Sequence, residues 1–232
     1  MPQHALLNNV DHAGLRIQTG HGAHFGDALM FATTFPAEFR DVQAHYPIVF
    51  RKSDDGTTFE PVALFGLEEG ENLFLANTGW DATYVPLTVQ RQPFLIGVDG
   101  DELLVHIDLD NPRCSTTIGE PVFLPHGGTT DFLERANSTL LAIHQGVQAT
   151  PVFIAALIAL ELLESFVLDV EQGDGSAGRL AGFYTINEDR LAALDAEVLG
   201  RLHRAGYLQA IFMAVASLSN LRALIERKHR AA

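Results

Sequence analysis

His106 and Asp108 come closest, among the residues of this chain, to a catalytic constellation. They lie two positions apart in 102–109, where alternating apolar residues predict a β-strand, so both side chains should point to one face. A His-x-Asp pair with a later histidine, here His126 or His144, is how many non-haem iron enzymes bind their metal. A metal-dependent enzyme is therefore one alternative. The other is a chance match in the acidic turn that begins at Asp108.

The other residues that could do chemistry carry weaker signals. A zinc site needs three or four convergent ligands, and the densest group of histidines offers no such spacing. We interpret this group as surface histidines of loops: His12, His21, His24 and His45. Cys114 is the only cysteine and has no adjacent histidine, which predicts an unpaired thiol. Because nucleophile-elbow and glycine-rich nucleotide-binding patterns are also missing, we predict no cofactor and no resident metal.

Aromatic and basic residues gather in 79–94, the segment with the strongest features of a binding surface. It holds the only tryptophan, a tyrosine and an arginine. Such side chains bind planar or anionic ligands and often lie at the centre of protein interfaces. With two residues from nearby segments, they form the predicted site for a small-molecule ligand or a protein partner: Trp80, Tyr84, Arg91, Tyr46 and Arg51. The alternative is that the tryptophan and tyrosine close one edge of the core.

The elements that must position these residues are strand-like before residue 130. The segments 46–52 and 59–67 flank an Asp-Asp-Gly turn, and together they predict a hairpin. A second hairpin is predicted for 93–98 and 102–109, which flank an Asp-Gly turn.

After residue 130 the apolar period becomes that of helices. Asp131 predicts an N-cap, Glu134 gives a start similar to a capping box, and Gly146 should end this first helix. Pro151 suits the first position of a second helix, which should run to about residue 164. Because this second helix is apolar almost all round, we expect it to lie in the centre of the core.

Two short strands, 166–170 and 179–186, are predicted next, joined by a glycine-rich turn. Asn187 should cap the following helix, which Gly206 should end. A last helix is predicted from about 208 to 228, with an apolar stripe along one face.

Together these elements predict an α+β fold in a single domain, 1–232. An antiparallel, strand-rich part, 1–129, should pack with a mainly helical part, 130–232, and the hairpin near 166–186 could extend the N-terminal sheet. At 232 residues the chain is long enough to bury a core without disulfides or metals.

Composition limits the partners. The formal net charge of −14 repels phosphate backbones and anionic headgroups, so we expect no nucleic acid and no membrane surface as a partner. The longest apolar stretch, 152–163, is shorter than the about 20 residues that a spanning helix needs, so we expect no membrane insertion. The N-terminus lacks the basic and apolar parts of a signal peptide, which predicts a cytoplasmic protein.

The order and spacing of several short motifs are similar to those of the bacterial SapC family. The motifs are Leu-Asn-Asn-Val at 7–10 with His12, Phe-Pro-Ala-Glu-Phe at 35–39, Tyr-Pro-Ile-Val-Phe at 46–50, the segment 80–94, and Gly-Phe-Tyr-Thr-Ile at 182–186 with Leu191 and Leu194. They span nearly the whole chain. The peptide-transporter permease of the same name is a different protein, because a permease needs membrane-spanning segments.

The resemblance implies no catalytic residue that could be assigned to this chain. Relatives are often encoded beside flavin-dependent halogenase-like proteins, cupin-like oxygenases and TonB-dependent receptors, which implies an accessory role. Our first hypothesis is therefore a non-catalytic binding or accessory protein, expected as a homodimer. The metal-dependent enzyme with His106 and Asp108 is the second hypothesis. An assembly factor for surface-layer proteins is the third.

Overall fold

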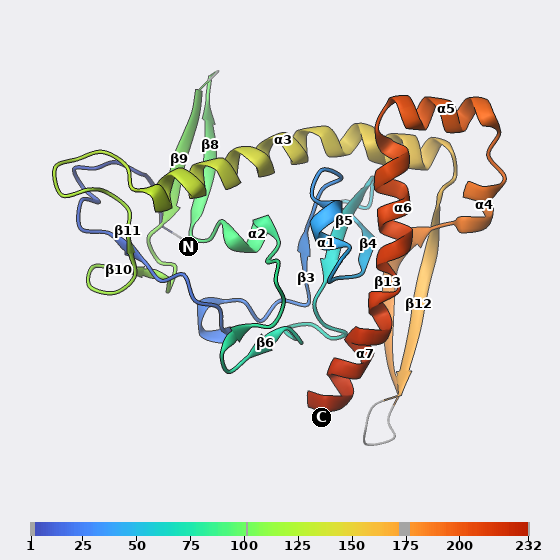
Figure 1. Cartoon of the computed structure of the whole chain (residues 1–232), viewed down its shortest axis with the longest axis horizontal. Helices are drawn as coiled ribbons and strands as arrows, with labels where there is room; N and C mark the ends of the chain where they lie inside the picture. The colour runs from blue at the N-terminus through green and yellow to red at the C-terminus, as the bar shows by residue number, and fades with distance from the viewer. Residues whose placement is uncertain (1–2, 101, 172–176, 232) are drawn as a thin grey trace. The chain divides into compact units, whose positions relative to one another are not determined.

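The computed structural model describes residues 3–100, 102–171 and 177–231 (Figure 1). Contacts divide the chain into two compact units. The first unit is formed by Met1–Asp27, Leu75–Asp81 and Leu87–Gln145, and the second by Ala28–Phe74, Ala82–Pro86 and Gly146–Ala232. Both units combine segments from before and after residue 130. The predicted α+β class is confirmed, since antiparallel sheets and helices are both abundant.

Two small antiparallel sheets form the first unit. One has the order β1-β9-β8 and the other the order β10-β2-β11. The strands are β1 (His4–Leu6), β2 (Arg16–Ile17), β8 (Phe94–Asp99), β9 (Glu102–Asp108), β10 (Cys114–Ser115) and β11 (Glu120–Pro121), with a further pair, β6 (Leu75–Ala76) and β7 (Gly79–Trp80). The 3₁₀-helix η1 (Ala23–Phe25) and helix α2 (Leu87–Gln90) complete it. The predicted hairpin of 93–98 and 102–109 is therefore confirmed.

The core of this unit lies where both sheets meet the first turns of helix α3 (Asp131–Ala159). Ile107 on β9 pairs with Phe94 on one side and Ala5 on the other. Both Ile107 and Phe94 are buried together with Ile17 on β2 and Leu133 on α3. Burial of such side chains is the main stabilising contribution to the unit, at about 1.5–3 kcal/mol for each.

A five-stranded antiparallel sheet, with the order β12-β13-β4-β5-β3, forms the second unit. Its strands are β3 (Phe31–Thr33), β4 (Ile48–Lys52), β5 (Phe59–Leu64), β12 (Leu163–Glu171) and β13 (Ala177–Ile186). Tyr184 on β13 pairs with Phe50 on β4, so the later hairpin extends the N-terminal sheet. The two hairpins predicted for this sheet, and their union in one sheet, are confirmed.

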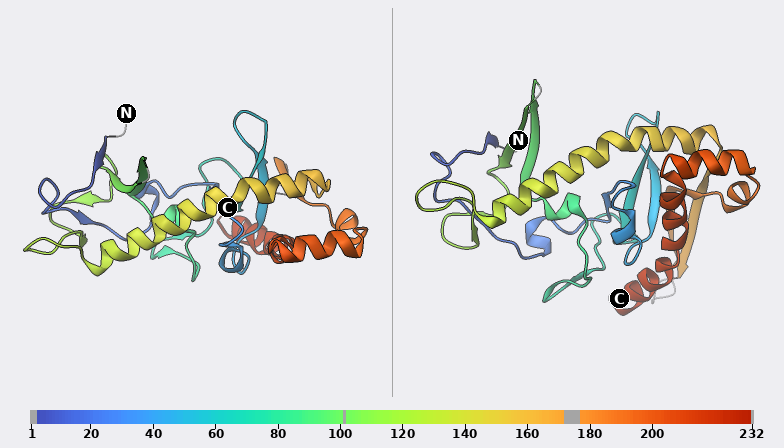
Figure 2. Two further views of the ribbon diagram at one scale, coloured as in Figure 1. Left: turned by 90° about the horizontal axis from the view of Figure 1, so that it is seen from above. Right: turned by 45° about the horizontal axis from the view of Figure 1, so that its top comes forward.

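Helix α3 runs without interruption from residue 131 to 159, as two further views also show (Figure 2). The prediction that Gly146 ends a helix and Pro151 begins another is wrong. Gly146 lies inside α3 because the ring of Phe35 packs against the helix backbone there, and a Cβ atom at residue 146 would lie 2.1 Å from that ring. The prediction that 150–164 lies in the centre of the core is also wrong, since Phe153 and Leu157 are buried but Val152 and Ile158 are exposed.

One predicted helix cap is wrong, one is confirmed, and a further cap divides a predicted helix. The hydroxyl of Thr130, and not Asp131, caps α3, because it accepts the N–H of Leu133 at 3.3 Å. Asn187 caps α4 (Glu188–Ala192) as predicted, but Asp195 then accepts the N–H of Val198 and starts a separate helix, α5 (Ala196–Arg204). A capping side chain within a long apolar pattern thus divides one predicted helix into two.

The last predicted helix is also two helices, α6 (Tyr207–Ser217) and α7 (Asn220–Ala231). Ser217 is buried, and its hydroxyl donates to the carbonyl of Ala214 and accepts the N–H of Ile48. The short helix α1 (Phe39–Val42) packs against α6. Hydroxyl bonds of this kind compete with the helical pattern, and α6 ends at Ser217.

Two helical stretches could cross a membrane by length and composition alone, Asp131–Ala159 and Tyr207–Arg230. In each, 28% of the most apolar 18 residues are buried. Long core helices of proteins outside membranes meet the same criteria, so these stretches do not establish a membrane location. The expectation of no membrane insertion and of a cytoplasmic location stays a prediction.

Candidate ligand-binding cavity

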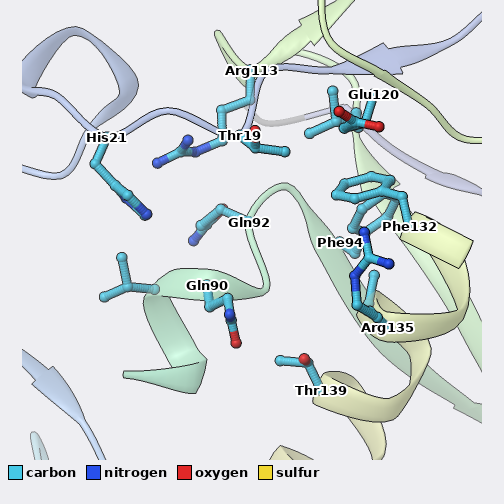
Figure 3. Close-up of a pocket in the computed structure, with 13 residues that line it drawn as sticks. Thr19, His21, Gln90, Gln92, Phe94, Arg113, Glu120, Phe132, Arg135 and Thr139 are labelled. Carbon is cyan, nitrogen blue, oxygen red and sulfur yellow. The ribbon is translucent and has the colours of Figure 1, made fainter. Parts of the chain in front are cut away.

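A cavity of about 340 Å³ lies within the first unit (Figure 3). We call it the Gln92 cavity. Its lining consists of Ile17, Thr19, His21, Val89, Gln90, Gln92, Phe94, Arg113, Glu120, Phe132, Arg135, Ala136 and Thr139. Eight of these side chains are polar or charged and five are apolar, so the lining is more polar than that of most small-molecule sites. The volume is at the lower end of the range of such sites.

Helices α2 and α3 and the start of strand β8 contribute most of these residues. Helix α3 contributes Phe132, Arg135 and Thr139, which are spaced by three and four residues and so share one helix face. The end of α2 and the turn into β8 contribute Gln90, Gln92 and Phe94. The rings of Phe94 and Phe132 lie 6.0 Å apart at a tilt of 53° and form an apolar wall.

Arg113 holds the chain at 18–27 in place beside the cavity. Its Nη2 atom donates to both carboxylate oxygens of Asp27, at 2.8 and 2.7 Å. Its Nη1 atom donates to the carbonyls of Gln18 and Gly20, and the guanidinium lies over the ring of Phe25 at 4.7 Å. Five contacts from one buried cation thus fix a segment that has little regular secondary structure.

Asp27 stays ionised in this environment. Burial alone would raise the pKa of Asp27, but contacts with His21, with the N–H of Gly22 and with Arg113 outweigh burial and hold the pKa below its usual value. The N–H of Gly22 donates to Oδ2 of Asp27 at 2.9 Å. The charge of the carboxylate is balanced by Arg113, so the pair is close to neutral.

His21 lies between this ion pair and the cavity. Its Nδ1 atom is buried 3.3 Å from Oδ2 of Asp27, but the two atoms do not form a hydrogen bond of normal geometry. No other partner of Nδ1 occurs among the described residues, so Asp27 is the group that this atom faces. The edge of the imidazole also packs against Trp80, with ring centres 5.4 Å apart.

The amide of Gln92 is oriented by a chain of hydrogen bonds. The backbone N–H of Arg113 donates to Oδ1 of Asn111 at 3.0 Å, and Nδ2 of Asn111 donates to Oε1 of Gln92 at 3.2 Å. A backbone N–H can only donate, so both amide orientations are determined. The Nε2 donor of Gln92 remains for the cavity, and in Figure 3 the side chains of Gln92 and His21 point toward one another.

Two charged residues of the lining, Glu120 and Arg135, are exposed. Neither forms an ion pair within the described part of the chain. The cavity therefore combines an oriented amide donor, an imidazole and two unpaired opposite charges around an apolar wall. Such a site can bind a small polar molecule and fix its orientation.

Of the predicted site residues, Trp80 and Arg91 belong to the first unit. Trp80 supports His21 through ring packing. Nη1 of Arg91 donates to the carbonyl of Phe94 at 2.7 Å, and burial lowers the pKa of Arg91. Neither residue lines the Gln92 cavity, although the flanking residues Gln90 and Gln92 do.

The other predicted site residues, Tyr46, Arg51 and Tyr84, belong to the second unit and have internal partners. Tyr46 is fully buried, and its hydroxyl donates to the carbonyl of Tyr84. The hydroxyl of Tyr84 donates to Glu38 at 2.9 Å, and burial together with that carboxylate raises the pKa of Tyr84. Arg51 pairs with Glu60 at 3.1 Å. Because Tyr46 has no exposed surface, we leave it out of the candidate site.

We expect Tyr46→Phe to destabilise the protein by about 1–2 kcal/mol, because the partly buried carbonyl of Tyr84 loses its donor. Tyr184→Phe is the matched control, because no described residue bonds its hydroxyl, and it should change stability by less than about 0.5 kcal/mol. Urea unfolding of the two variants measures the difference. If the two variants are equally stable and Tyr46→Phe binds a ligand more weakly than the wild type, Tyr46 has a role in binding.

His106 and Asp108 lie on β9, two residues apart as predicted, but the structure gives no third ligand. Among residues 3–100, 102–171 and 177–231, no group of three histidine, cysteine or acidic side chains could hold a metal ion. The ring of His106 instead covers Gly97 of the neighbouring strand, where a Cβ would lie 2.7 Å from the imidazole. The metal-dependent alternative therefore finds no support in the described residues.

The remaining histidines of the predicted group and the cysteine have local roles. His12 bonds the backbone of Asn8, and His45 lies 2.9 Å from the hydroxyl of Thr83. The Sγ atom of Cys114 lies 3.4 Å from the carbonyl of Asp108. Burial and the Asp108 carboxylate raise the pKa of Cys114 to about 11, so its thiol is inert at neutral pH.

The residues that sequence reasoning missed are Asp27, Gln90, Gln92 and Arg113. Arg113 and Asp27 are 86 positions apart, and neither belongs to a recognisable motif. Gln90 and Gln92 flank the predicted Arg91, so the segment was predicted but its binding side chains were not. The only feature of the sequence that indicated His21 was its place in the dense group of histidines.

A protein-family model described as SapC matches residues 7–224. No curated protein and no solved structure matches the chain. The matched range includes all the residues that line the Gln92 cavity.

Proposed function

The chain belongs to the SapC family, and on that premise we propose that it is a binding protein that holds a small molecule in the Gln92 cavity. The cavity lies inside the family's matched range, so it is part of the family domain and not of an added segment. A site of this kind needs no reaction to be useful, because a binding protein can deliver, store or sense its ligand.

The observation that carries the proposal is the fixed direction of the polar groups around the apolar wall. Asp27 and Arg113 form a buried ion pair, and such pairs contribute little net stability because desolvation offsets their attraction. Here the pair immobilises the segment that carries His21. An oriented site loses less conformational entropy when a ligand binds, so preorganisation increases affinity.

The accessory role beside flavin-dependent or iron-dependent enzymes and uptake receptors remains a prediction from the resemblance. The same holds for the homodimer, for a protein partner and for the surface-layer assembly factor. A small-molecule binder is compatible with the accessory role, since tailoring enzymes and uptake systems both handle small molecules.

Filling the cavity tests the proposal. In Thr139→Trp the indole should occupy the space between α3 and Gln90, and binding of small aromatic amides, acids and alcohols should fall at least about tenfold. Ser138→Trp is the control, because Ser138 is exposed on the same helix and does not line the cavity. Saturation-transfer NMR with the wild type and both variants measures binding, and melting curves check that each is folded.

Two results would count against the proposal. Fragments that bind Thr139→Trp as well as they bind the wild type have their site elsewhere. A wild-type protein that binds none of the fragments has no small-molecule site of this kind in the cavity.

A further inference from the structure

The donor that Gln92 presents to the cavity is fixed by neighbours that do not titrate. Its Oε1 atom is occupied by Asn111, whose own amide is held by the backbone N–H of Arg113. Turning the Gln92 amide over would place its Nε2 donor against the Nδ2 donor of Asn111, and Oε1 of Gln92 would lose its partner. The cavity therefore meets an N–H donor at Gln92 and not an acceptor.

The group that His21 presents to the cavity follows from the charge beside its other ring nitrogen, Nδ1. Nδ1 is buried against the ionised Asp27, so a proton on Nδ1 faces a negative charge. A neutral imidazole with its proton on Nδ1 has a lone pair on Nε2. The charges around the ring already balance. Arg113 neutralises Asp27, and the other two charged residues of the cavity, Glu120 and Arg135, have opposite signs.

We propose, on the basis of the proposed function, that His21 and Gln92 together recognise an amide edge. A primary carboxamide or a lactam carries an N–H donor and a carbonyl acceptor side by side on one edge. Its N–H would donate to Nε2 of His21, and its carbonyl would accept from Nε2 of Gln92. The ligand class is therefore small carboxamides and lactams.

The wall of the cavity fits an apolar group next to that amide. Phe94 is fully buried beneath the cavity and Phe132 packs beside it at 6.0 Å. A flat ring attached to the carboxamide would contact these two side chains, because aromatic rings pair favourably at such distances. Benzamide combines both features and serves as the probe, with benzoate as the matching anion that lacks the N–H donor.

The first measurement needs no ligand. A two-bond ¹H–¹⁵N correlation spectrum reports which imidazole nitrogen carries the proton, and His21→Phe identifies the His21 signals by their loss. We expect the proton on Nδ1 and a lone pair on Nε2. A proton on Nε2, or on both nitrogens at neutral pH, would overturn the inference whatever the cavity binds.

The second measurement compares benzamide and benzoate by NMR titration. We expect benzamide to bind the wild type about tenfold more tightly than benzoate, which corresponds to one additional hydrogen bond. Gln92→Glu replaces the donor by an acceptor of the same shape and should weaken benzamide binding about tenfold. Ser138→Glu is the control, because it adds the same charge at an exposed position of α3 that does not line the cavity, and it should change the affinity by less than about threefold.

The outcomes separate this inference from the proposed function. If neither probe binds the wild type, both are overturned. If the probes bind but benzoate is preferred, or if Ser138→Glu weakens benzamide binding as much as Gln92→Glu does, the cavity remains a binding site and only the amide-edge inference is overturned.

Discussion

Asp27→Ala is expected to destabilise the protein by about 3–5 kcal/mol, because it leaves the Arg113 cation buried without its partner. Both side chains are only 3% exposed, so water cannot replace the lost carboxylate. Asp169→Ala is the control, since Asp169 pairs with Arg179 on an exposed surface and should cost less than about 1 kcal/mol. Urea unfolding of both variants gives the free energies of unfolding.

The same pair predicts a dependence on pH. The pKa of Asp27 is lower in the folded state than in the unfolded state. Ionised Asp27 therefore stabilises the fold fully at pH values above its unfolded-state pKa, and this stabilisation is lost as the pH falls through its folded-state pKa. The wild type should therefore lose more stability than Asp27→Ala between neutral pH and acid. If the free energies of unfolding of the two proteins changed in parallel with pH, ionisation of Asp27 would not stabilise the folded protein.

A double variant, Asp27→Leu with Arg113→Met, separates the cost of an unpaired charge from the value of the pair. Two apolar residues leave no buried charge, so the double variant should be more stable than Asp27→Ala. It should also lose binding in the Gln92 cavity, because the carbonyls of Gln18 and Gly20 lose their donor. A double variant less stable than Asp27→Ala would contradict this account.

Gly146→Ala is expected to destabilise the protein by about 1–3 kcal/mol, although alanine favours helices. The new Cβ atom would lie 2.1–2.5 Å from three ring atoms of Phe35, which is buried and cannot move away easily. Gly200→Ala in α5 is the matched control, because the nearest atom there is the flexible end of Arg204 at 3.3 Å. This control should be stabilised by about 0.5–1 kcal/mol.

Opposite signs for these two substitutions, measured by thermal unfolding, are the expected result. If both stabilise the protein, the ring of Phe35 does not pack against α3 as described. In addition, Phe35→Leu should lower the free energy of unfolding less in the Gly146→Ala variant than in the wild type, because the smaller side chain relieves the overlap with the new Cβ atom.

The fold could be predicted from the sequence where local pattern and tertiary structure agree. Alternating apolar residues and glycine turns identified the hairpins, and the return of strands at 166–186 indicated their place in the sheet. Helix boundaries failed where a distant contact decided them. Gly146 stays helical because Phe35 packs on it, a contact between residues more than 100 positions apart.

The candidate site could be predicted only as a segment. Aromatic and basic residues identified 79–94, but their side chains mostly support the structure: Trp80 packs on His21 and Arg91 bonds the backbone. Glutamine is uncharged and Gln92 belongs to no known motif, so nothing in the sequence indicates that Asn111 orients it. Such an arrangement depends on distances between separate loops, and one-dimensional spacing does not contain them.

The unreactive thiol of Cys114 has a practical consequence. With a pKa of about 11, about one molecule in ten thousand carries a thiolate at neutral pH. A cysteine introduced at the exposed Ser138 would therefore react with a maleimide dye long before the native thiol does. The protein can accept a single fluorescent label on α3, near the cavity, without first being made cysteine-free.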